Sequence, residues 1–158
     1  MKLIKMLLLL LGLIFTHPLS ATVISRTFTP NVTIFNNSHS DGLEIVAPQK
    51  DFVLLYDSDR QTFHDLKIPF DVVSKKGTVV DYKLSLPIIE GSCILGDDSE
   101  NIVLDIYVND NKWDGDGLPF SGVRNSHVMT IAYPNLEQKN IDQKCFGIIG
   151  VQVESVVL

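Results

Sequence analysis

Apolar and polar side chains alternate with a period of two over much of this chain, which is the repeat of a β-strand with one buried face. The segment from Leu66 to Val72 is the clearest example, with Lys67, Pro69 and Asp71 between its apolar residues. Similar or shorter β-rich stretches predict further strands over residues 43–47, 52–56, 80–86, 102–108, 127–133 and 149–157. The 3.6-residue period of an amphipathic helix is almost absent, so the pattern predicts an all-β fold.

Short polar segments separate these strands and carry residues that favour turns. Examples are Ser-Asp-Gly at residues 40–42, Lys-Lys-Gly at 75–77 and Asp-Gly-Asp-Gly at 114–117. Seven or eight short strands joined by polar turns are typical of a β-sandwich in a single domain.

The first 21 residues are expected to form a cleavable signal peptide. Lys2 and Lys5 precede an apolar run over residues 6–15, which is too short to cross a bilayer, and Ala21 suits a cleavage site. An uncleaved anchor is the alternative. Export predicts that the working protein starts near residue 22.

The two cysteines, Cys93 and Cys145, have a natural role in an exported protein. An even cysteine count in an oxidising compartment predicts one disulfide, which here closes a loop of about 53 residues. Two separate buried thiols are the alternative. Neither cysteine has a second cysteine or a histidine at the spacing of metal ligands.

The charge of the mature chain argues against two classes of partner. Without Lys2 and Lys5, 11 basic residues stand against 19 acidic ones, a net charge of −8. Such a surface repels phosphate backbones and anionic lipids, so we expect no nucleic-acid partner and no membrane surface as a partner.

Both ends of the mature chain have the composition of strands. In Thr22 to Ile34, one face carries apolar residues and Pro30, and the other carries threonines and Asn31. Residues 146–158 alternate up to the last position. Bare apolar strands at both ends favour aggregation in a monomer, so we expect another chain to supply or receive a strand.

The sequence offers little that indicates catalysis. His39, His64 and His127 lack metal-ligand spacing, and we expect them to be solvated or hydrogen-bonded at the surface. No serine lies in a G-x-S-x-G nucleophile element. We therefore expect no enzyme activity, no catalytic residues, no metal and no cofactor.

Residues 109–117, N-D-N-K-W-D-G-D-G, combine acidic residues and glycines as a calcium loop does. In the register that places Gly115 at the sixth position of an EF-hand, Lys112 and Ser121 take the third and twelfth positions, where oxygen-rich ligands are needed. An EF-hand is therefore disfavoured, and a looser calcium site remains as an alternative. Trp113 either contacts a ligand or, as we favour, covers one end of the sandwich.

Three segments resemble the subunits of chaperone–usher fimbriae, most of all the colonisation-factor (class 5) pilins of enteric bacteria. The first is the alternating stretch S-R-T-F-T-P-N-V-T-I at residues 25–34. The second is Val53 to Phe63 followed by L-K-I-P-F-D-V-V, and the third is Cys145 to Leu158, in which a glycine precedes alternating apolar residues. Major subunits of that group usually lack cysteine, so the cysteine pair leaves open whether this chain is a major subunit, a minor subunit or a member of a neighbouring class.

The resemblance implies an incomplete immunoglobulin-like β-sandwich, residues 36–158, that is completed by a donated strand, with residues 22–35 as the donor extension. The donor residues it implies are Phe28, Pro30, Val32 and Ile34, of which Phe28, Val32 and Ile34 would enter pockets of the neighbour while Thr29 and Thr33 face away. The strand lining the acceptor groove would carry Ile149, Val151, Val153 and Val157.

The implied function is that of a structural subunit of an adhesive fimbrium, exported through the periplasm to the bacterial cell surface. Its implied partners are identical or related pilin subunits, a periplasmic chaperone, an outer-membrane usher and a host-cell glycan or receptor. Two other classes stay open: a stand-alone exported β-sandwich that binds a glycan or protein, with its N-terminal strand in its own sheet, and a small secreted hydrolase.

Overall fold

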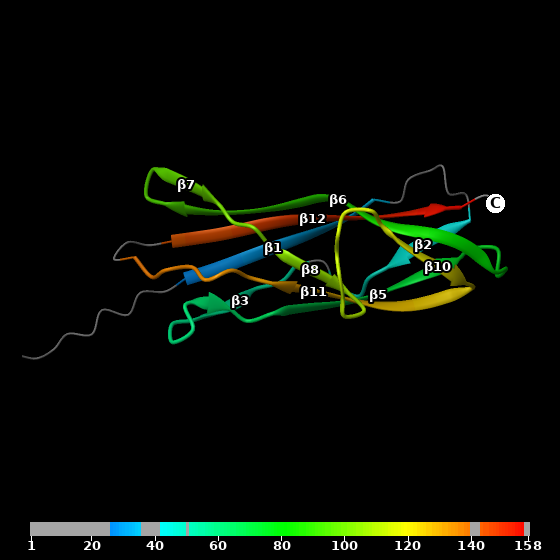
Figure 1. Cartoon of the computed structure of the whole chain (residues 1–158), viewed down its shortest axis with the longest axis horizontal. Helices are drawn as coiled ribbons and strands as arrows, with labels where there is room; N and C mark the ends of the chain where they lie inside the picture. The colour runs from blue at the N-terminus through cyan, green and yellow to red at the C-terminus, as the bar shows by residue number, and fades with distance from the viewer. Residues whose placement is uncertain (1–25, 36–41, 50, 140–142, 157–158) are drawn as a thin grey trace, which may run out of the picture.

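The computed structural model describes residues 26–35, 42–49, 51–139 and 143–156, and every regular element in these ranges is a strand (Figure 1). One sheet contains β1 (Arg26–Phe35), β3 (Leu54–Asp57), β4 (Thr62–Phe63), β6 (Val80–Leu95), β7 (Asp98–Asn101), β10 (Leu118–Gly122) and β12 (Gln143–Ser155). The other contains β2 (Leu43–Val46), β5 (Leu66–Ser74), β8 (Asp105–Val108), β9 (Asn111–Lys112) and β11 (Arg124–Ala132). The prediction of an all-β sandwich is thus confirmed. No helix in these ranges is long and apolar enough to cross a membrane.

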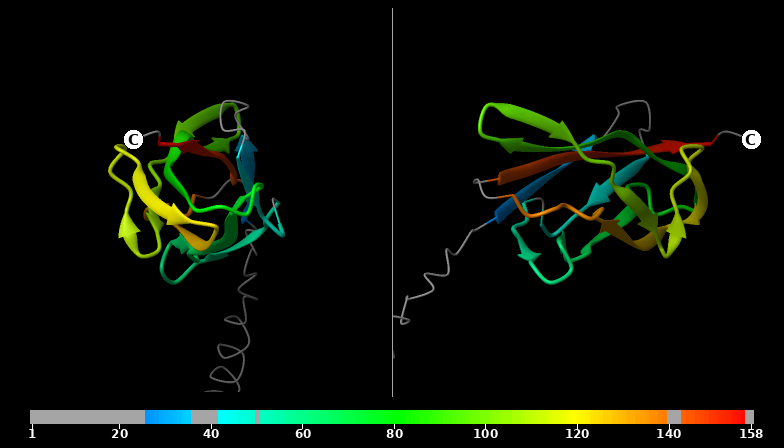
Figure 2. Two further views of the ribbon diagram at one scale, coloured as in Figure 1. Left: turned by 90° about the vertical axis from the view of Figure 1, so that its right-hand side faces the viewer. Right: turned by 60° about the vertical axis from the view of Figure 1, so that its left-hand side comes forward.

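The order of the strands places the chain's two terminal strands side by side. The larger sheet runs β10-β6-β12-β1-β3-β4, with β7 paired to β6, and the smaller sheet runs β2-β5-β11-β8-β9. The strands surround a common interior in the end-on view of Figure 2. The signal peptide predicted for residues 1–21 lies outside the described residues.

The alternating residues of the sequence form the core between the two sheets. In β5, Leu66, Ile68, Phe70 and Val72 are buried, while the residues between them are exposed or half-buried. Each fully buried aliphatic or aromatic side chain contributes about 1.5–3 kcal/mol to stability. The buried partners from other strands include Leu43, Phe63, Tyr82, Leu84, Ile106, Val108, Met129, Ile131, Ile149 and Val151.

Two predicted strands have the wrong extent. The strand predicted over residues 80–86 continues to Leu95, so Cys93 lies inside β6 rather than after it. The strand predicted over residues 102–108 begins only at Asp105, because the chain crosses there from the larger sheet to the smaller one. Ile102 and Leu104 are nevertheless buried, as their alternation predicted.

The crossing is fixed by close packing over a glycine of β6. The N–H of Ile102 donates to the carbonyl of Gly91 at 2.9 Å. A Cβ atom on Gly91 would lie 2.7 Å from Cγ1 of Ile102, closer than real Cβ contacts allow. Only glycine therefore fits beneath this segment.

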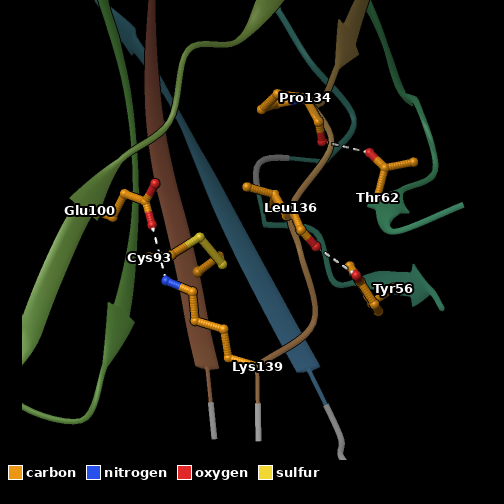
Figure 3. Close-up of a disulfide and its surroundings, with 8 residues drawn as sticks. Tyr56, Thr62, Cys93, Glu100, Pro134, Leu136 and Lys139 are labelled. Atoms are coloured by element: carbon orange, nitrogen blue, oxygen red, sulfur yellow. Dashed lines mark hydrogen bonds and ion pairs between the residues drawn. A yellow bond between two sulfur atoms is a disulfide. The ribbon is translucent and has the colours of Figure 1, made fainter. Parts of the chain in front are cut away.

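The predicted disulfide is confirmed, and it joins two neighbouring strands. Cys93 in β6 lies directly opposite Cys145 in β12, with 4.0 Å between their Cα atoms. Figure 3 shows the bridge beside the ion pair of Glu100 with Lys139, whose Oε2 and Nζ atoms are 3.8 Å apart. Because the loop it closes spans 52 residues, the bridge removes much conformational freedom from the unfolded chain.

Replacing either Cys93 or Cys145 by serine should lower the free energy of unfolding by about 2–5 kcal/mol. Urea denaturation of the variants and the oxidised wild-type protein measures the difference, and a reducing agent should destabilise only the wild type. Two free thiols in denatured, unreduced wild-type protein would contradict the assignment.

Candidate functional site: the strand gap beside β12

The C-terminal strand β12 lies in the middle of the larger sheet and needs a partner on each side. On one side it pairs antiparallel with β6 from Gln143 to Ser155, with one irregularity between Gly150 and Gln152. Its inward-facing residues Ile149, Val151 and Val153 are buried in the core. Val157, the fourth predicted residue of this wall, lies outside the described residues.

On its other side, β12 pairs with β1, the segment predicted to be a donor strand. Ten residue pairs run from Arg26 opposite Gln143 to Phe35 opposite Gln152, and the two strands are parallel. Figure 1 shows β1 in blue along β12 in orange and red. The register places the four predicted donor residues opposite buried positions of β12: Phe28 opposite Cys145, Pro30 opposite Gly147, Val32 opposite Ile149 and Ile34 opposite Val151.

The second flank of β1 is much less complete. It pairs with β3 only through Thr27 opposite Leu55 and Phe28 opposite Leu54, in the antiparallel direction. In the described part of the chain, no second strand pairs with β1 beyond Phe28. We call the position between β12 and β3, which β1 fills, the strand gap. The backbone of β12 is therefore the main support of β1.

The strand gap is suited to binding an extended peptide. If β1 left, β12 would present a row of unpaired N–H and C=O groups beside exposed core residues. An extended segment that enters the gap restores the ladder through main-chain hydrogen bonds, and its alternate side chains give specificity.

A buried polar cluster around His127 lies away from this gap and is a correction to the sequence prediction. We expected a surface histidine, but His127 is only 2% exposed. It shares the inward face of β11 with Met129 and Ile131, and the rings of Phe70 and Phe120 lie against it with centroids 5.3 and 4.5 Å away. The alternation within residues 127–133 contained this signal, since His127 has the parity of the two buried residues.

The hydrogen bonds around the His127 ring determine which of its nitrogens carries the proton. The N–H of Val128 donates to Oδ1 of Asn109 at 3.0 Å, so the amide nitrogen of Asn109 donates to Nδ1 of His127, also at 3.0 Å. Nδ1 therefore carries a lone pair, and Nε2–H donates to the hydroxyl oxygen of Tyr82 at 2.9 Å. Asn125 donates to the same oxygen at 2.8 Å. Nothing in the sequence pattern predicted that these polar residues would meet.

The surroundings favour the neutral ring. Burial lowers the pKa of His127, and the negative charge of Asp71 opposes this to a smaller extent. Asp71 accepts hydrogen bonds from Ser126 and Arg124, and these bonds lower its own pKa. A proton on Nδ1 would face the amide hydrogens of Asn109, so protonation breaks this bond as well as charging a buried group.

The remaining candidates from the sequence are the other histidines, Trp113 and the possible calcium loop. His64 is exposed, and His39 lies outside the described residues. Trp113 is half-buried and packs against the core, as expected of a residue that covers the sandwich. In the segment 109–117, the N–H of Asp116 donates to Oδ1 of Asp114 at 3.1 Å, which is an ordinary Asx turn. No group of three potential metal ligands occurs among the described residues.

Comparisons with known proteins include a distant structural likeness. No family model matches the chain, and a search of curated proteins found no match. Among solved structures, the chain is similar to the CooA pilin subunit from enterotoxigenic Escherichia coli, with a TM-score of 0.44 and 9% sequence identity. The overlap covers 74% of this chain and 99% of that chain.

Because the pKa of His127 is lowered in the folded protein, the unfolded chain takes up a proton more readily. The stabilisation by neutral His127 should be complete above about pH 6.5, the usual histidine pKa, and should be lost as the pH falls through the folded-state pKa. Urea denaturation between pH 7.5 and 5 measures this slope.

The control for this slope is His127→Gln, which has no titrating ring. It should be less stable at pH 7.5 but should lose the slope between pH 6.5 and 5. An unchanged slope in the variant would assign the pH dependence to other groups.

Proposed function

We propose that this chain is a structural subunit of an adhesive fimbrium and that it polymerises by donor-strand exchange. In this proposal β1 leaves the strand gap of its own copy and enters the gap of the next copy. The observation that supports the proposal is the position of β1, a segment near the chain start that fills the interior of a sheet but is held mainly by β12.

Exchange between copies needs no new kind of contact. The segment that enters the gap has the same sequence as the one that leaves, so it again offers main-chain hydrogen bonds and one apolar face to the gap, as in domain swapping. Each copy donates to one neighbour and accepts from another. Such head-to-tail contacts do not close on themselves and therefore build a fibre.

The direction of pairing gives the exchange a driving force. Within one copy, β1 runs parallel to β12. A strand from a second copy is free to enter in the opposite direction, and antiparallel pairs are slightly more stable per residue than parallel ones. Over the ten residue positions of β1, a small advantage per residue adds up.

The proposal includes further partners, because an open strand gap would make subunits aggregate. While β1 is out, β12 and its buried neighbours need cover, or subunits aggregate through exposed strand edges. We assign that cover to a periplasmic chaperone, and release onto the growing fibre at the cell surface to an outer-membrane usher. A host-cell glycan or receptor is the partner of the finished fibre.

A stand-alone exported β-sandwich that binds a glycan or protein is the second candidate. One observation favours it: β1 lies in the chain's own sheet, so a single copy has a complete β12 ladder from Arg26 to Phe35. The two candidates differ in whether β1 exchanges between copies.

A labelled peptide with the sequence of residues 22–35 should be incorporated into the purified mature chain by displacing β1. We expect slow incorporation, because the resident strand must leave first, and gel filtration with the label as readout measures it. A matched pair of peptides tests which face of the segment is buried. Val32→Asp, on its apolar face, should abolish incorporation, whereas Asn31→Asp, on its polar face, should not.

Burying an unpaired carboxylate costs several kcal/mol, which is the reason for the expected difference between the two peptides. The same substitutions in the full chain should respectively stop and permit fibres seen by electron microscopy. If no peptide enters and the chain stays monomeric, the stand-alone candidate replaces the fimbrial one. Equal behaviour of the two variants would show that the buried face of the segment is assigned wrongly.

Removing residues 22–35 should make the mature chain aggregate, and a copy of these residues attached after Leu158 through a short polar linker should restore a soluble monomer. The linker forces the copy to return antiparallel to β12, the direction proposed for exchange. Light scattering and circular dichroism follow both variants. Persistent aggregation of the fusion protein would mean that the gap accepts only the parallel strand.

A further inference from the structure

A pocket of about 380 Å³ lies at the seam of β6 and β12, on the side of β12 away from β1. Pockets that bind small molecules begin at about this size. Its lining comes from three segments: Ile89, Glu90, Gly91 and Ser92 in β6, Asn101 and Ile102 at the end of β7, and Phe146, Gly147 and Ile148 in β12.

Four of the lining side chains, those of Glu90, Ser92, Phe146 and Ile148, share the face of the sheet that is opposite to the buried disulfide. Phe146 lies opposite Ser92 and Ile148 opposite Glu90 in the ladder, one residue out of step with the buried disulfide pair. The side chain of Phe146 is 42% exposed, which is a large exposed fraction for an aromatic residue in a regular strand. It presents an apolar ring to an incoming molecule.

Between these residues the backbone of the seam is uncovered on the exposed face. Gly91 and Gly147 lie opposite each other in the ladder and in step with the buried disulfide pair, so this position of both strands faces the core. A molecule in the pocket can therefore approach the backbone of both strands. The nearby disulfide, which adjoins Ser92 and Phe146 along the chain, ties the two strands together and fixes their spacing.

Three polar side chains at the rim are available to a ligand. The side chains of Glu90, Ser92 and Asn101 make no hydrogen bond or ion pair with the described residues. Together they offer a carboxylate and an amide oxygen as acceptors, and a hydroxyl and an amide nitrogen as donors. The pocket thus combines an aromatic surface with several hydrogen-bonding groups that point to a ligand rich in hydroxyls.

We propose that this pocket binds a neutral saccharide. A sugar ring has an apolar face that can lie on Phe146, while its hydroxyls donate to Glu90 and accept from Asn101 and Ser92. The carboxylate of Glu90, and the absence of lysine or arginine among the described residues that line the pocket, disfavour sialylated or phosphorylated ligands. A second copy of this chain would also cover Phe146, but it would not need this set of unpaired polar groups.

This inference deepens the proposed function, because it gives the adhesive fibre a class of receptor. It does not depend on polymerisation, since the pocket lies at the β6–β12 seam and β1 pairs with the other edge of β12. A monomer that binds a saccharide but does not exchange strands would support the pocket and contradict the fimbrial proposal. A fibre that binds no saccharide would support the fimbrial proposal and contradict the pocket.

In the test, the purified mature chain is applied to an array of neutral and sialylated oligosaccharides. The neutral saccharide that binds most strongly on the array is then titrated into the protein by calorimetry. Phe146→Ala and Glu90→Gln should each weaken binding by about tenfold or more, through loss of the aromatic surface and of the charge-assisted hydrogen bonds respectively. Ile94→Ala is the matched control, because Ile94 lies on the same strand face, is 41% exposed and does not line the pocket; it should change affinity by less than about twofold.

Circular dichroism of each variant confirms that it is folded before titration. Absence of any neutral array ligand, binding of sialylated saccharides alone, or equal affinity of wild type, Phe146→Ala and Glu90→Gln would each overturn the proposal. If Phe146→Ala alters only self-association in sedimentation experiments and no saccharide binds, the surface is a contact between copies and the proposal is wrong.

Discussion

Backbone pairing along β12 is the interaction on which the rest of this structure depends. The strand has β6 on one side and β1 on the other, and its alternate residues form the middle of the core. Main-chain groups that are buried without a partner destabilise a fold strongly, so both edges of β12 must be occupied whenever the protein is folded. The edge beside β6 is secured by a long antiparallel ladder and by the bridge from Cys93 to Cys145.

The edge beside β1 is built differently. Its partner runs parallel, has little support from β3, and is joined to β2 through residues 36–41. One edge is thus covalently reinforced, and the other depends on a strand that only the β12 ladder holds well. This asymmetry suits the proposed exchange, in which the core must survive while one strand leaves. It also separates the two proposed activities, because the pocket lies at the reinforced β6–β12 seam and β1 lies at the other edge of β12.

The cluster around His127 shows how the interior tolerates polar groups away from that strand. Tyr82 and Asn109 hydrogen-bond to the imidazole, Asn125 donates to Tyr82, and aromatic rings from two strands pack against His127. The neutral ring is the form that this set of donors and acceptors accommodates. The cluster therefore stabilises the sandwich at neutral pH, and its stabilisation is tied to the protonation of one residue.

Local alternation in the sequence determined the fold class, the positions of most strands and which side chains face inward. This is because the two faces of a strand are set by a period of two that needs no knowledge of its neighbours. The alternation even held for Ile102 and Leu104, where no strand forms. It failed in β6, where Leu86 and Pro87 lie opposite Val151 alone and shift the buried positions from even to odd numbers. Only the tertiary structure decided the pairing of Cys93 opposite Cys145, the cluster around His127, the pocket at the β6–β12 seam and the parallel entry of β1, since each depends on contacts between segments far apart in the chain.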